Sequence, residues 1–501
     1  MINTVIFSDE ITVWWDKEWA LPDGIFYRIS LNNKKIRDTD KTHLSIKDLS
    51  PSTRYCVRVD RLEKGKPVQC LGAVDVTTPQ EKRRIDVCRA PYFAIGDGVT
   101  VNTEALQRAI NNCGPNECVY FPAGTFLTGA LVLHSDMEIY LDTGATLQGT
   151  ARVEDYLPKI KSRFEGWETE CYSSLLNAGE LDSNSEPNCH NIIIRGKGSI
   201  FGGGAELSEK IIETEKVRLR EYLNANAEYV SSCECDRTIP GRQRGRLINL
   251  SNTENVIISG LTLGFAASWN VHFIYSRNII TYGCRILSRG VWNGDGWDPD
   301  SSENCTIFDT EFKTHDNSIA IKSGKNPEGN LIGRPSRGIR VFDCHGGNSL
   351  AIGSEMSGGV SDVFVWDCDF SDTVHSGFGI KFTQKRGGYI KNVKVRNCRF
   401  VQLLARCVDY NDDGEAAKEL TEVENISFEN IDLSGIGNNL SGIPTISERV
   451  LLLRGLENPE KYIKNITLKD IRILKRDGIE EAIEIKNTES LTVNNITFIE
   501  D

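Results

Sequence analysis

Three closely spaced aspartates and a further aspartate on a later turn lie in the stretch VWNGDGWDPDSSENCTIFDTEFKTHDNSIAIKSG, residues 291–324. Asp295, Asp298 and Asp300 precede a β-rich run, and Asp316 follows that run on a second turn. If both turns lie on one side of a stack of strands, their carboxylates converge. Two carboxylates facing one cavity can hydrolyse a glycosidic bond, since one protonates the leaving oxygen while the other activates water or attacks the sugar. Asp and Asn in such turns can equally serve only to form Asx-turns between strands.

The composition is that of an ordinary globular protein, with 39% hydrophobic and 26% charged residues in 501. The net charge of −12 provides no basic field, so we expect neither nucleic acid nor a membrane as a partner. The chain starts without a basic segment followed by an apolar one, and it contains no apolar run of about 18 residues. These features predict a cytoplasmic protein, and they leave its oligomeric state open.

The 15 cysteines are scattered singly along the chain, which is typical of buried thiols in a reducing compartment. Only Cys233 and Cys235 lie close together, and no second pair completes a zinc site. We therefore expect no metal.

The chain divides into two regions with different patterns. Residues 1–80 alternate apolar and polar residues in short runs between turns, which predicts a small β-sandwich. Within it, LSPSTRYCVRV, residues 49–59, resembles the turn and the tyrosine-bearing strand of fibronectin type III domains. A charged, proline-flanked stretch at residues 79–91 predicts the linker to a second domain, residues 85–501.

The second region contains a loose repeat, in which a turn residue is followed by alternating β-branched or aromatic residues. Its copies start at Asn255, Asn278, Asn304, Gly338, Asp362, Asn392, Asn425 and Asn465. Several neighbouring copies start 23 to 30 residues apart, and a period in this range indicates a solenoid. Each unit carries short strands and no helix, so we expect an all-β fold, a parallel β-helix, with its variable loops along one face.

One segment departs from this β pattern. AELSEKIIETEKVRLREYL, residues 205–223, is rich in helix formers with charges at i,i+4 spacing, and it predicts a helical insertion near residues 205–225 beside the groove. A basic cluster follows it and can line the mouth of the groove: Arg237, Arg242, Arg244 and Arg246.

Several segments of residues 85–500 resemble, in the same order, those of the polygalacturonases of glycoside hydrolase family 28. They are FAIGDGVTVNTEALQRAI, SWNVHFIYSRNI, NGDGWDPDSS, DNSIAIKSG, IGSEMSGG and IKFTQKRGG. The resemblance implies a right-handed parallel β-helix, and an N-terminal fibronectin-like module is familiar among the bacterial members.

Two of the four site motifs of that family keep their acids. Asn-Thr-Asp falls on Asn293-Gly294-Asp295, and the resemblance implies that Asp295 helps to activate water and that Asn293 contacts the substrate. Asp-Asp falls on Asp316-Asn317, so Asp316 keeps the place of the general acid while an amide replaces the second carboxylate. Inversion needs one acid and one base with a water between them, so this pair meets the minimum.

The other two motifs depart further. Gly-His-Gly falls on residues 347–349, Gly-Asn-Ser, where the histidine is missing. Arg-Ile-Lys falls on residues 379–381, Gly-Ile-Lys, where the arginine is missing. Glycine cannot clamp a carboxylate as arginine does, so the preference for a uronic acid is open.

Other side chains in these motifs are candidates for the site. Lys322, Lys381 and Arg386 can supply positive charge to an acidic sugar, and Asp298 can help or replace Asp295. His315 can shift the pKa of the neighbouring acid or take the place of the missing histidine, although a histidine in a turn is more often a packing residue.

The remaining candidates are a carboxylate and several aromatic residues. Glu355 contacts either the substrate or its neighbours within the stack. Trp292, Trp297 and Tyr410 can stack on sugar faces. The alternative is that they pack in the core, as most aromatic residues in a solenoid do. The loop VDYNDDGE, residues 408–415, is either a second acidic contact to the substrate or a plain turn.

We therefore expect an inverting, exo-polygalacturonase-like glycoside hydrolase that acts on short pectin-derived oligosaccharides and needs no cofactor. One alternative is a relative with specificity for a rhamnogalacturonan or a neutral glycoside. The others are a non-catalytic carbohydrate-binding relative, suggested by the altered motifs, and a polysaccharide lyase, which would need a basic residue in place of the acid pair.

Overall fold

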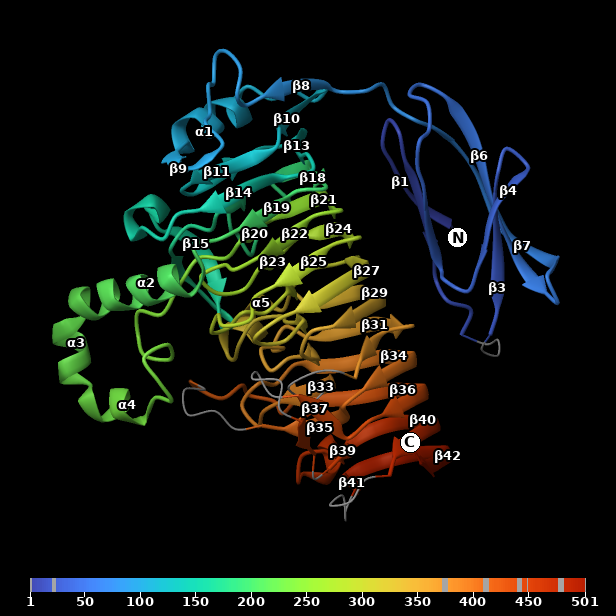
Figure 1. The fold of residues 1–501 in the computed structure, drawn as a ribbon. Helices are drawn as coiled ribbons and strands as arrows, with labels where there is room; N and C mark the ends of the chain where they lie inside the picture. Colours follow the sequence, from blue (N-terminus) through green and yellow to red (C-terminus); the bar gives the residue numbers. More distant parts are fainter. Residues whose placement is uncertain are drawn as a thin grey trace. The chain divides into compact units, whose positions relative to one another are not determined.

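The structure is a computed structural model that describes residues 2–19, 24–371, 377–408, 414–438, 444–447, 449–475 and 482–500. The chain divides into two compact units, residues 1–84 and 85–501 (Figure 1). No helix in the described residues is long and apolar enough to cross a membrane.

The first unit consists of two small antiparallel sheets. Their strands are β1 (Ile2–Ile6), β2 (Ile11–Trp15) and β5 (His43–Ile46) in one sheet, and β4 (Lys34–Thr39), β3 (Phe26–Leu31), β6 (Arg54–Glu63) and β7 (Lys66–Thr77) in the other. Val13, Ile29 and Val59 are fully buried in a core made by both sheets. The hydroxyl of Tyr55 accepts a hydrogen bond from the backbone N–H of Ser50 at 3.0 Å. The unit is therefore a β-sandwich, and its fibronectin type III class stays a prediction.

The second unit is the predicted parallel β-helix. Its strands pair in parallel from coil to coil, so each strand lies beside the equivalent strand of the next coil. One long sheet contains β8 (Arg83–Asp86), β9 (Asp97–Val101), β10 (Glu117–Phe121), β11 (Gly124–Thr128), β13 (Met137–Leu141), β14 (Ala145–Gly149), β18 (Cys189–Gly196), β19 (Ser199–Phe201), β21 (Thr253–Ser259), β22 (Thr262–Gly264), β24 (Arg277–Tyr282), β25 (Arg285–Leu287), β27 (Thr306–Lys313), β29 (Ser336–Gly346), β31 (Val360–Trp366), β32 (Asp369–Phe370), β34 (Tyr389–Phe400), β36 (Glu422–Leu433), β40 (Ile463–Leu474) and β42 (Thr488–Ile499).

A second parallel sheet carries the candidate site. Its strands are β12 (Leu131–Leu133), β17 (Leu176–Ala178), β20 (Ile248–Ser251), β23 (Val271–Ile274), β26 (Trp297–Asp300), β28 (Ile319–Ile321), β30 (Leu350–Ile352), β33 (Gly377–Phe382), β35 (Gln402–Cys407), β39 (Leu451–Arg454) and β41 (Ile483–Lys486). Val271, Trp297, Ile319, Leu350 and Phe378 occupy the same register position in successive coils and are all fully buried. Such inward stacks form a continuous core in which each coil completes its neighbour.

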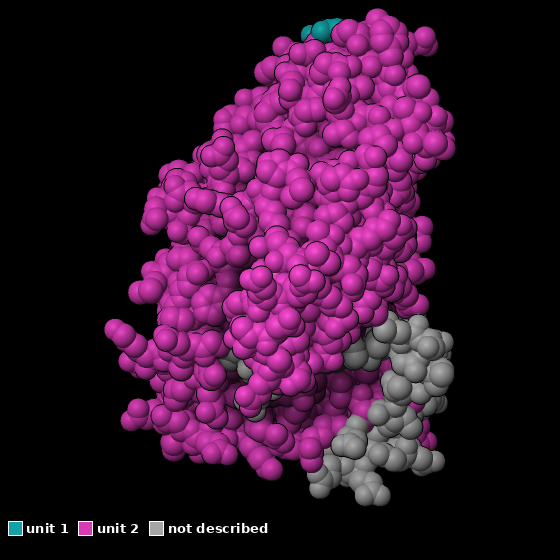
Figure 2. Space-filling model, turned by 90° about the vertical axis from the view of Figure 1, so that its left-hand side faces the viewer, with its two compact units in different colours: residues 1–84 teal, residues 85–501 magenta. Residues whose placement is uncertain are grey.

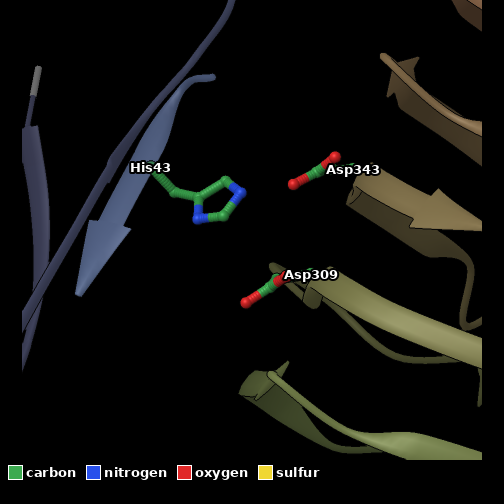
Figure 3. Close-up of side chains that lie close together, drawn as sticks. All are labelled: His43, Asp309 and Asp343. Carbon is green, nitrogen blue, oxygen red and sulfur yellow. The ribbon is translucent and has the colours of Figure 1, made fainter. Parts of the chain in front are cut away.

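The strands β27, β29 and β31 of the long sheet carry the same kinds of residue at equivalent positions. Phe308, Phe342 and Trp366 stack nearly parallel, with ring centroids 4.8 and 4.4 Å apart. Asp309 and Asp343 lie on adjacent coils (Figure 3), directly after the first two of these rings. Both have a left-handed backbone with φ of 49°. Asp tolerates this conformation better than most residues, which explains its recurrence at this bend.

Two segments leave the coils near the site, a helical insertion and a hairpin. Helices α2 (Gly204–Arg218), α3 (Arg220–Ala225) and α4 (Ala227–Ser232) form the insertion, which extends beyond the helical segment expected from the sequence. The hairpin of β15 (Ile160–Phe164) and β16 (Trp167–Cys171) precedes it. Two short helices lie elsewhere, α1 (Thr103–Asn111) and α5 (Glu328–Ile332). Figure 2 views the second unit from the side on which α2 to α4 lie in Figure 1.

Candidate active site

A cavity of about 460 Å³ lies where the second sheet meets the hairpin and the helical insertion. The coils contribute Trp269, Trp292, Asn293, Asp295, Asp316, Asn317, Lys322, Lys325, Gly353, Ser354, Glu355, Lys381 and Arg386. The hairpin contributes Glu165, and the insertion with the segment after it contributes Tyr229, Ser232, Cys233, Glu234, Thr238 and Arg242. The cavity is therefore lined by both acidic and basic side chains, and the insertion forms one of its walls.

The regular stacking of the coils brings the two candidate acids together. Asp295 precedes β26 and Asp316 precedes β28 in the next coil, and the two coils are joined by a hydrogen bond from the N–H of Gly296 to the carbonyl of Asn317 at 2.9 Å. Trp297 and Ile319 share a register position, so Asp295 lies beside Asn317, and Asp316 is one residue before that point on the adjacent coil. Adjacent parallel strands are only about 4.8 Å apart, so this offset still leaves both acids at one cavity.

Asp295 is almost completely buried, with 1% of its surface exposed, although it lines the cavity. One of its carboxylate oxygens is 3.4 Å from Nζ of Lys322, and the other has no hydrogen-bonding partner among the described residues. Burial, and then the charge of Asp316, raise the pKa of Asp295 to about 7, against the opposing effect of Lys322. A carboxylate with this pKa can gain and lose a proton near neutral pH.

Asp298 is fully buried and contributes no surface to the cavity. Neither carboxylate oxygen has a hydrogen-bonding partner among the described residues. Burial and the neighbouring Asp295 hold the pKa of Asp298 well above its usual range. Asp298 therefore cannot replace Asp295 at the surface of the cavity, and its role as a helper, through its neighbour, stays a prediction.

Asp316 and Asn317 contribute to the site from the coil next to that of Asp295. Oδ1 of Asp316 accepts two hydrogen bonds from Asn317, at 2.8 Å from the backbone N–H and at 3.0 Å from the side-chain amide. The amide oxygen of Asn317 accepts from Oγ of Ser349 at 2.7 Å and from Nζ of Lys381 at 3.4 Å. Asn317 therefore connects the acid to a cation in the cavity.

Lys322 lies between two carboxylates and an aromatic ring. Its ammonium group is 3.4 Å from Asp295, 3.6 Å from Glu355 and 4.9 Å from the centre of the Trp269 ring. Burial alone would raise the pKa of Glu355, but Lys322 and Arg386 outweigh it and lower this pKa to about 2. Glu355 is therefore an ionised carboxylate that balances the cations beside it.

A fully buried ion pair fixes the hairpin to the coils. Arg163 of β15 donates to Asp300 of β26 at 2.6 Å, and both side chains are 1% exposed. His272 is 3.3 Å from the same carboxylate. Burial alone would raise the pKa of Asp300, but Arg163 and His272 outweigh it and hold this pKa at about 2. Asp300 is thus a structural anion, in contrast to the neighbouring Asp295 and Asp298.

The hairpin tip rests directly on the site. Its turn is Glu165-Gly166, and a Cβ atom on Gly166 would lie only 2.5 Å from Cβ of Lys325 and 2.9 Å from Cγ of Glu355. Gly166 also has a positive φ of 85°, so a side chain at this position would be excluded on both counts. Glu165 lines the cavity and forms an ion pair with Arg242 at 2.7 Å.

The model of glycosyl hydrolases family 28 matches residues 121–442. The chain belongs to this family. The matched range contains the whole cavity, from the hairpin to Arg386, and its fold is that of a polygalacturonase-like glycoside hydrolase.

Two curated family 28 relatives are the exo-poly-alpha-D-galacturonosidase of Dickeya chrysanthemi and the probable polygalacturonase of Vitis vinifera. The first is 30% identical over 309 residues, which cover 58% of this chain and 50% of that protein. The second is 33% identical over 322 residues, which cover 61% of this chain and 58% of that protein. The chain thus spans about half the length of these relatives.

Two solved structures share the fold. The family 28 exopolygalacturonase of Yersinia enterocolitica superimposes with a TM-score of 0.81 at 20% identity, over 100% of this chain and 97% of that one. The exopolygalacturonase of Thermotoga maritima superimposes with a TM-score of 0.66 at 26% identity, over 83% of this chain and 91% of that one. The prediction of a family 28 β-helix is confirmed.

A buried amide occupies the position of the missing family 28 histidine. Asn348 is 1% exposed, and its amide donates to the carbonyl of His315 at 3.1 Å, inside the stack. His315 does not replace the histidine either, because it contributes no surface to the cavity and its Nδ1 accepts from the N–H of Gly290.

Of the aromatic candidates that the structure describes, one is buried in the core and one lines the cavity. Trp297 is fully buried, its Nε1–H donates to Thr281, and its ring packs on Phe273, so the expected role in stacking on a sugar is wrong. Trp292 does line the cavity, and so does Trp269, which the sequence did not single out. Tyr410, Asp412 and Asp413 lie outside the described residues.

Arg244 is a site residue that could be located only as part of a basic cluster. It is fully buried and donates to the carbonyl of Trp292 at 3.2 Å, to Oδ1 of Asn293 at 2.6 Å and to Oγ of Ser208 in α2 at 3.1 Å. Burial lowers the pKa of Arg244 to about 10. Arg244 thus fastens the loop of the first family motif to the insertion, and it leaves the amide oxygen of Asn293 occupied.

Replacing Asp298 by Asn is expected to stabilise the protein at alkaline pH. Since the pKa of Asp298 is raised on folding, its contribution to stability is complete below the unfolded value of about 3.9 and is lost as pH rises through the folded value. At pH 4 the carboxyl group of Asp298 in the folded parent protein and the amide of the variant are both neutral, so the parent protein and the variant should melt at similar temperatures. At pH 8 the variant should be about 1–3 kcal/mol more stable, since its amide cannot ionise and so does not favour the unfolded chain as the carboxyl group of Asp298 does.

Thermal melting from pH 4 to pH 9 checks this expectation. Asp48→Asn removes an equal charge from an exposed position and serves as the control. A difference between Asp298→Asn and the parent protein that stays constant with pH would contradict a raised pKa.

Proposed function

We propose that the protein is an inverting, exo-acting glycoside hydrolase that cleaves short pectin-derived oligosaccharides. Asp316 is the general acid and Asp295 is the general base. One observation carries this proposal: Asp295 and Asp316, on adjacent coils, line one cavity together with Lys322 and Lys381. Two carboxylates in one cavity can provide the acid and the base that inversion requires, and the cations suit an acidic sugar.

The environment of Asp295 supports its role as base. A general base is most effective when its pKa lies near the working pH, and the pKa of Asp295 is about 7. Since Asp295 must be ionised to accept a proton from water, kcat/KM should fall as the pH is lowered through about 7.

The shape of the cavity supports exo action on short chains. The insertion and the segment after it contribute Tyr229, Ser232, Cys233, Glu234 and Thr238 to one wall, whereas an endo-acting enzyme needs a groove that a long chain can cross. A cytoplasmic location is a further part of this proposal. It would limit the enzyme to oligosaccharides that enter the cell, and fractionation of cells that express the protein would test it.

A second candidate is hydrolysis of a rhamnogalacturonan or of a neutral glycoside by the same acid pair. It is supported by Gly379 and Asn317, which stand where the family motifs have an arginine and a second carboxylate. Both candidates use the same chemistry and differ only in the sugars bound.

The deciding experiment is incubation with oligogalacturonides, rhamnogalacturonan oligosaccharides and neutral oligosaccharides, followed by separation of the products. Release of single galacturonate units, with inversion detected by proton NMR immediately after cleavage, supports the first candidate. Activity on the other substrates alone supports the second. Unsaturated products that absorb in the ultraviolet would identify a lyase, and binding without turnover would identify a non-catalytic relative.

A further inference from the structure

We propose that Asn317 determines the preference for an acidic sugar, because its neutral amide is the hydrogen-bonding partner of Lys381 among the described residues and so leaves this ammonium group available to the carboxylate of the substrate. In this way Asn317 compensates for the guanidinium that is absent at Gly379. The inference rests on the proposed function and adds a specificity-determining residue to it.

The orientation of the Asn317 amide follows from its partners. An ammonium group only donates hydrogen bonds, so the amide atom 3.4 Å from Nζ of Lys381 must be the oxygen. The same oxygen accepts from Oγ of Ser349 at 2.7 Å, and the amide nitrogen then faces Oδ1 of Asp316 at 3.0 Å. Asn317 is 9% exposed, so solvent contributes little to this arrangement.

Lys381 differs in its partners from Lys322 and Arg242, two other cations of the cavity. Lys322 is shared by the carboxylates of Asp295 and Glu355, and Arg242 is paired with Glu165. Among the residues that the structure describes, the ammonium group of Lys381 has one hydrogen-bonding partner, the neutral amide oxygen of Asn317. Within that part of the chain, Lys381 is thus held in place without an ion pair.

A carboxylate at position 317 would change two contacts at once. It would form an ion pair with Lys381, and it would replace the hydrogen bond to Asp316 by repulsion between two carboxylates. The substrate carboxylate would then have to compete with an internal one for the same cation. Relative to the family motifs, this chain has lost one anion at Asn317 and one cation at Gly379, so the net charge of this part of the cavity is unchanged.

The test compares Asn317→Asp, Lys381→Met and the double variant on digalacturonate and on its methyl ester, which has the same sugars without the charge. Asn317→Asp is expected to raise KM for digalacturonate about tenfold or more, with little change in KM for the ester. Lys381→Met should cause a similar selective loss. Asn317→Asp should then add no further selective loss in the Lys381→Met background, because its effect acts through that ammonium group.

Asn224→Asp adds the same charge to α3, outside the cavity lining, and controls for the change in net charge. Equal changes in KM for acid and ester, or a lower KM for digalacturonate in Asn317→Asp, would overturn the inference. Should the parent protein hydrolyse neither substrate, the proposed function fails by itself. Calorimetric titration with galacturonate and its methyl ester then decides the inference, which requires binding of the acid that weakens in Asn317→Asp and is rejected if acid and ester bind alike.

Discussion

Replacing Asp316 by Asn is expected to lower kcat about 10²–10⁴-fold on oligogalacturonides, because an amide cannot give a proton to the leaving oxygen. Asp295→Asn should cause a loss of similar size, since the amide cannot take a proton from the attacking water. Both side chains line the cavity, and Asn has nearly the same shape as Asp, so the fold should be preserved. Steady-state kinetics with a melting curve of each variant makes the measurement.

The two roles can be separated by the choice of leaving group. The aryl oxide of an aryl galacturonide can leave without being protonated. Asp316→Asn should therefore retain much of its activity on that substrate, whereas Asp295→Asn should not. Asp298→Asn makes the same chemical change in a side chain that contributes no surface to the cavity, and it should lose far less activity. If Asp298→Asn were as inactive as the other two, or if the aryl substrate rescued only Asp295→Asn, the assignment of roles would be wrong.

Replacing Arg163 by Met is expected to lower the free energy of unfolding by about 3–5 kcal/mol, because it leaves the carboxylate of Asp300 buried without its cation. Arg163 and Asp300 are both 1% exposed, and their closest atoms are 2.6 Å apart. His272 cannot replace the arginine, because burial lowers its pKa to about 3 and keeps it neutral at neutral pH. Urea unfolding of the full chain measures the loss.

The double variant Arg163→Met with Asp300→Asn removes both charges, and it should recover part of the stability lost in Arg163→Met. A double variant no more stable than Arg163→Met would show that the arginine acts by packing against its neighbours. A loss below about 1 kcal/mol in the single variant would be typical of an exposed pair and would contradict the burial of this one.

The repeat was sufficient to predict the β-helix, and the resemblance to family 28 singled out Asp295 and Asp316, which the structure brings to one cavity and whose catalytic roles stay predictions. The repeat positions predict which residues stack, and stacking brings Asp295 and Asp316 to adjacent coils. The alternation of side chains does not say what covers the outer face of a strand. Every residue of β26 is buried, because Trp297 points into the core while the other face is covered by the hairpin, and this contact joins segments 137 residues apart.

The wall of the cavity was less accessible to prediction. The helix-forming pattern located α2 and α3, but the lining comes from α4 and the segment after it, residues 229–242. Whether a charged residue there faces a cavity depends on partners far away in the chain. Arg242 faces the cavity because Glu165 of the hairpin pairs with it, while Arg237 pairs with Glu209 in α2. No local signal distinguishes these two arginines.

The close approach of Gly241 to α2 has a consequence for how this wall could have arisen. A Cβ atom on Gly241 would lie 2.8 Å from Cδ1 of Leu219 and 2.9 Å from Cβ of Glu215, so the chain returns after α4 almost to the point where it left α2. Leu207 and Ile211 of α2 are packed in a core with Tyr156 and Tyr172, whereas α3 and α4 contain no buried residue. A segment whose two ends meet, and whose interior adds nothing to the core, can be gained or lost in evolution as one piece, and the shape of the cavity can change while every coil keeps its register.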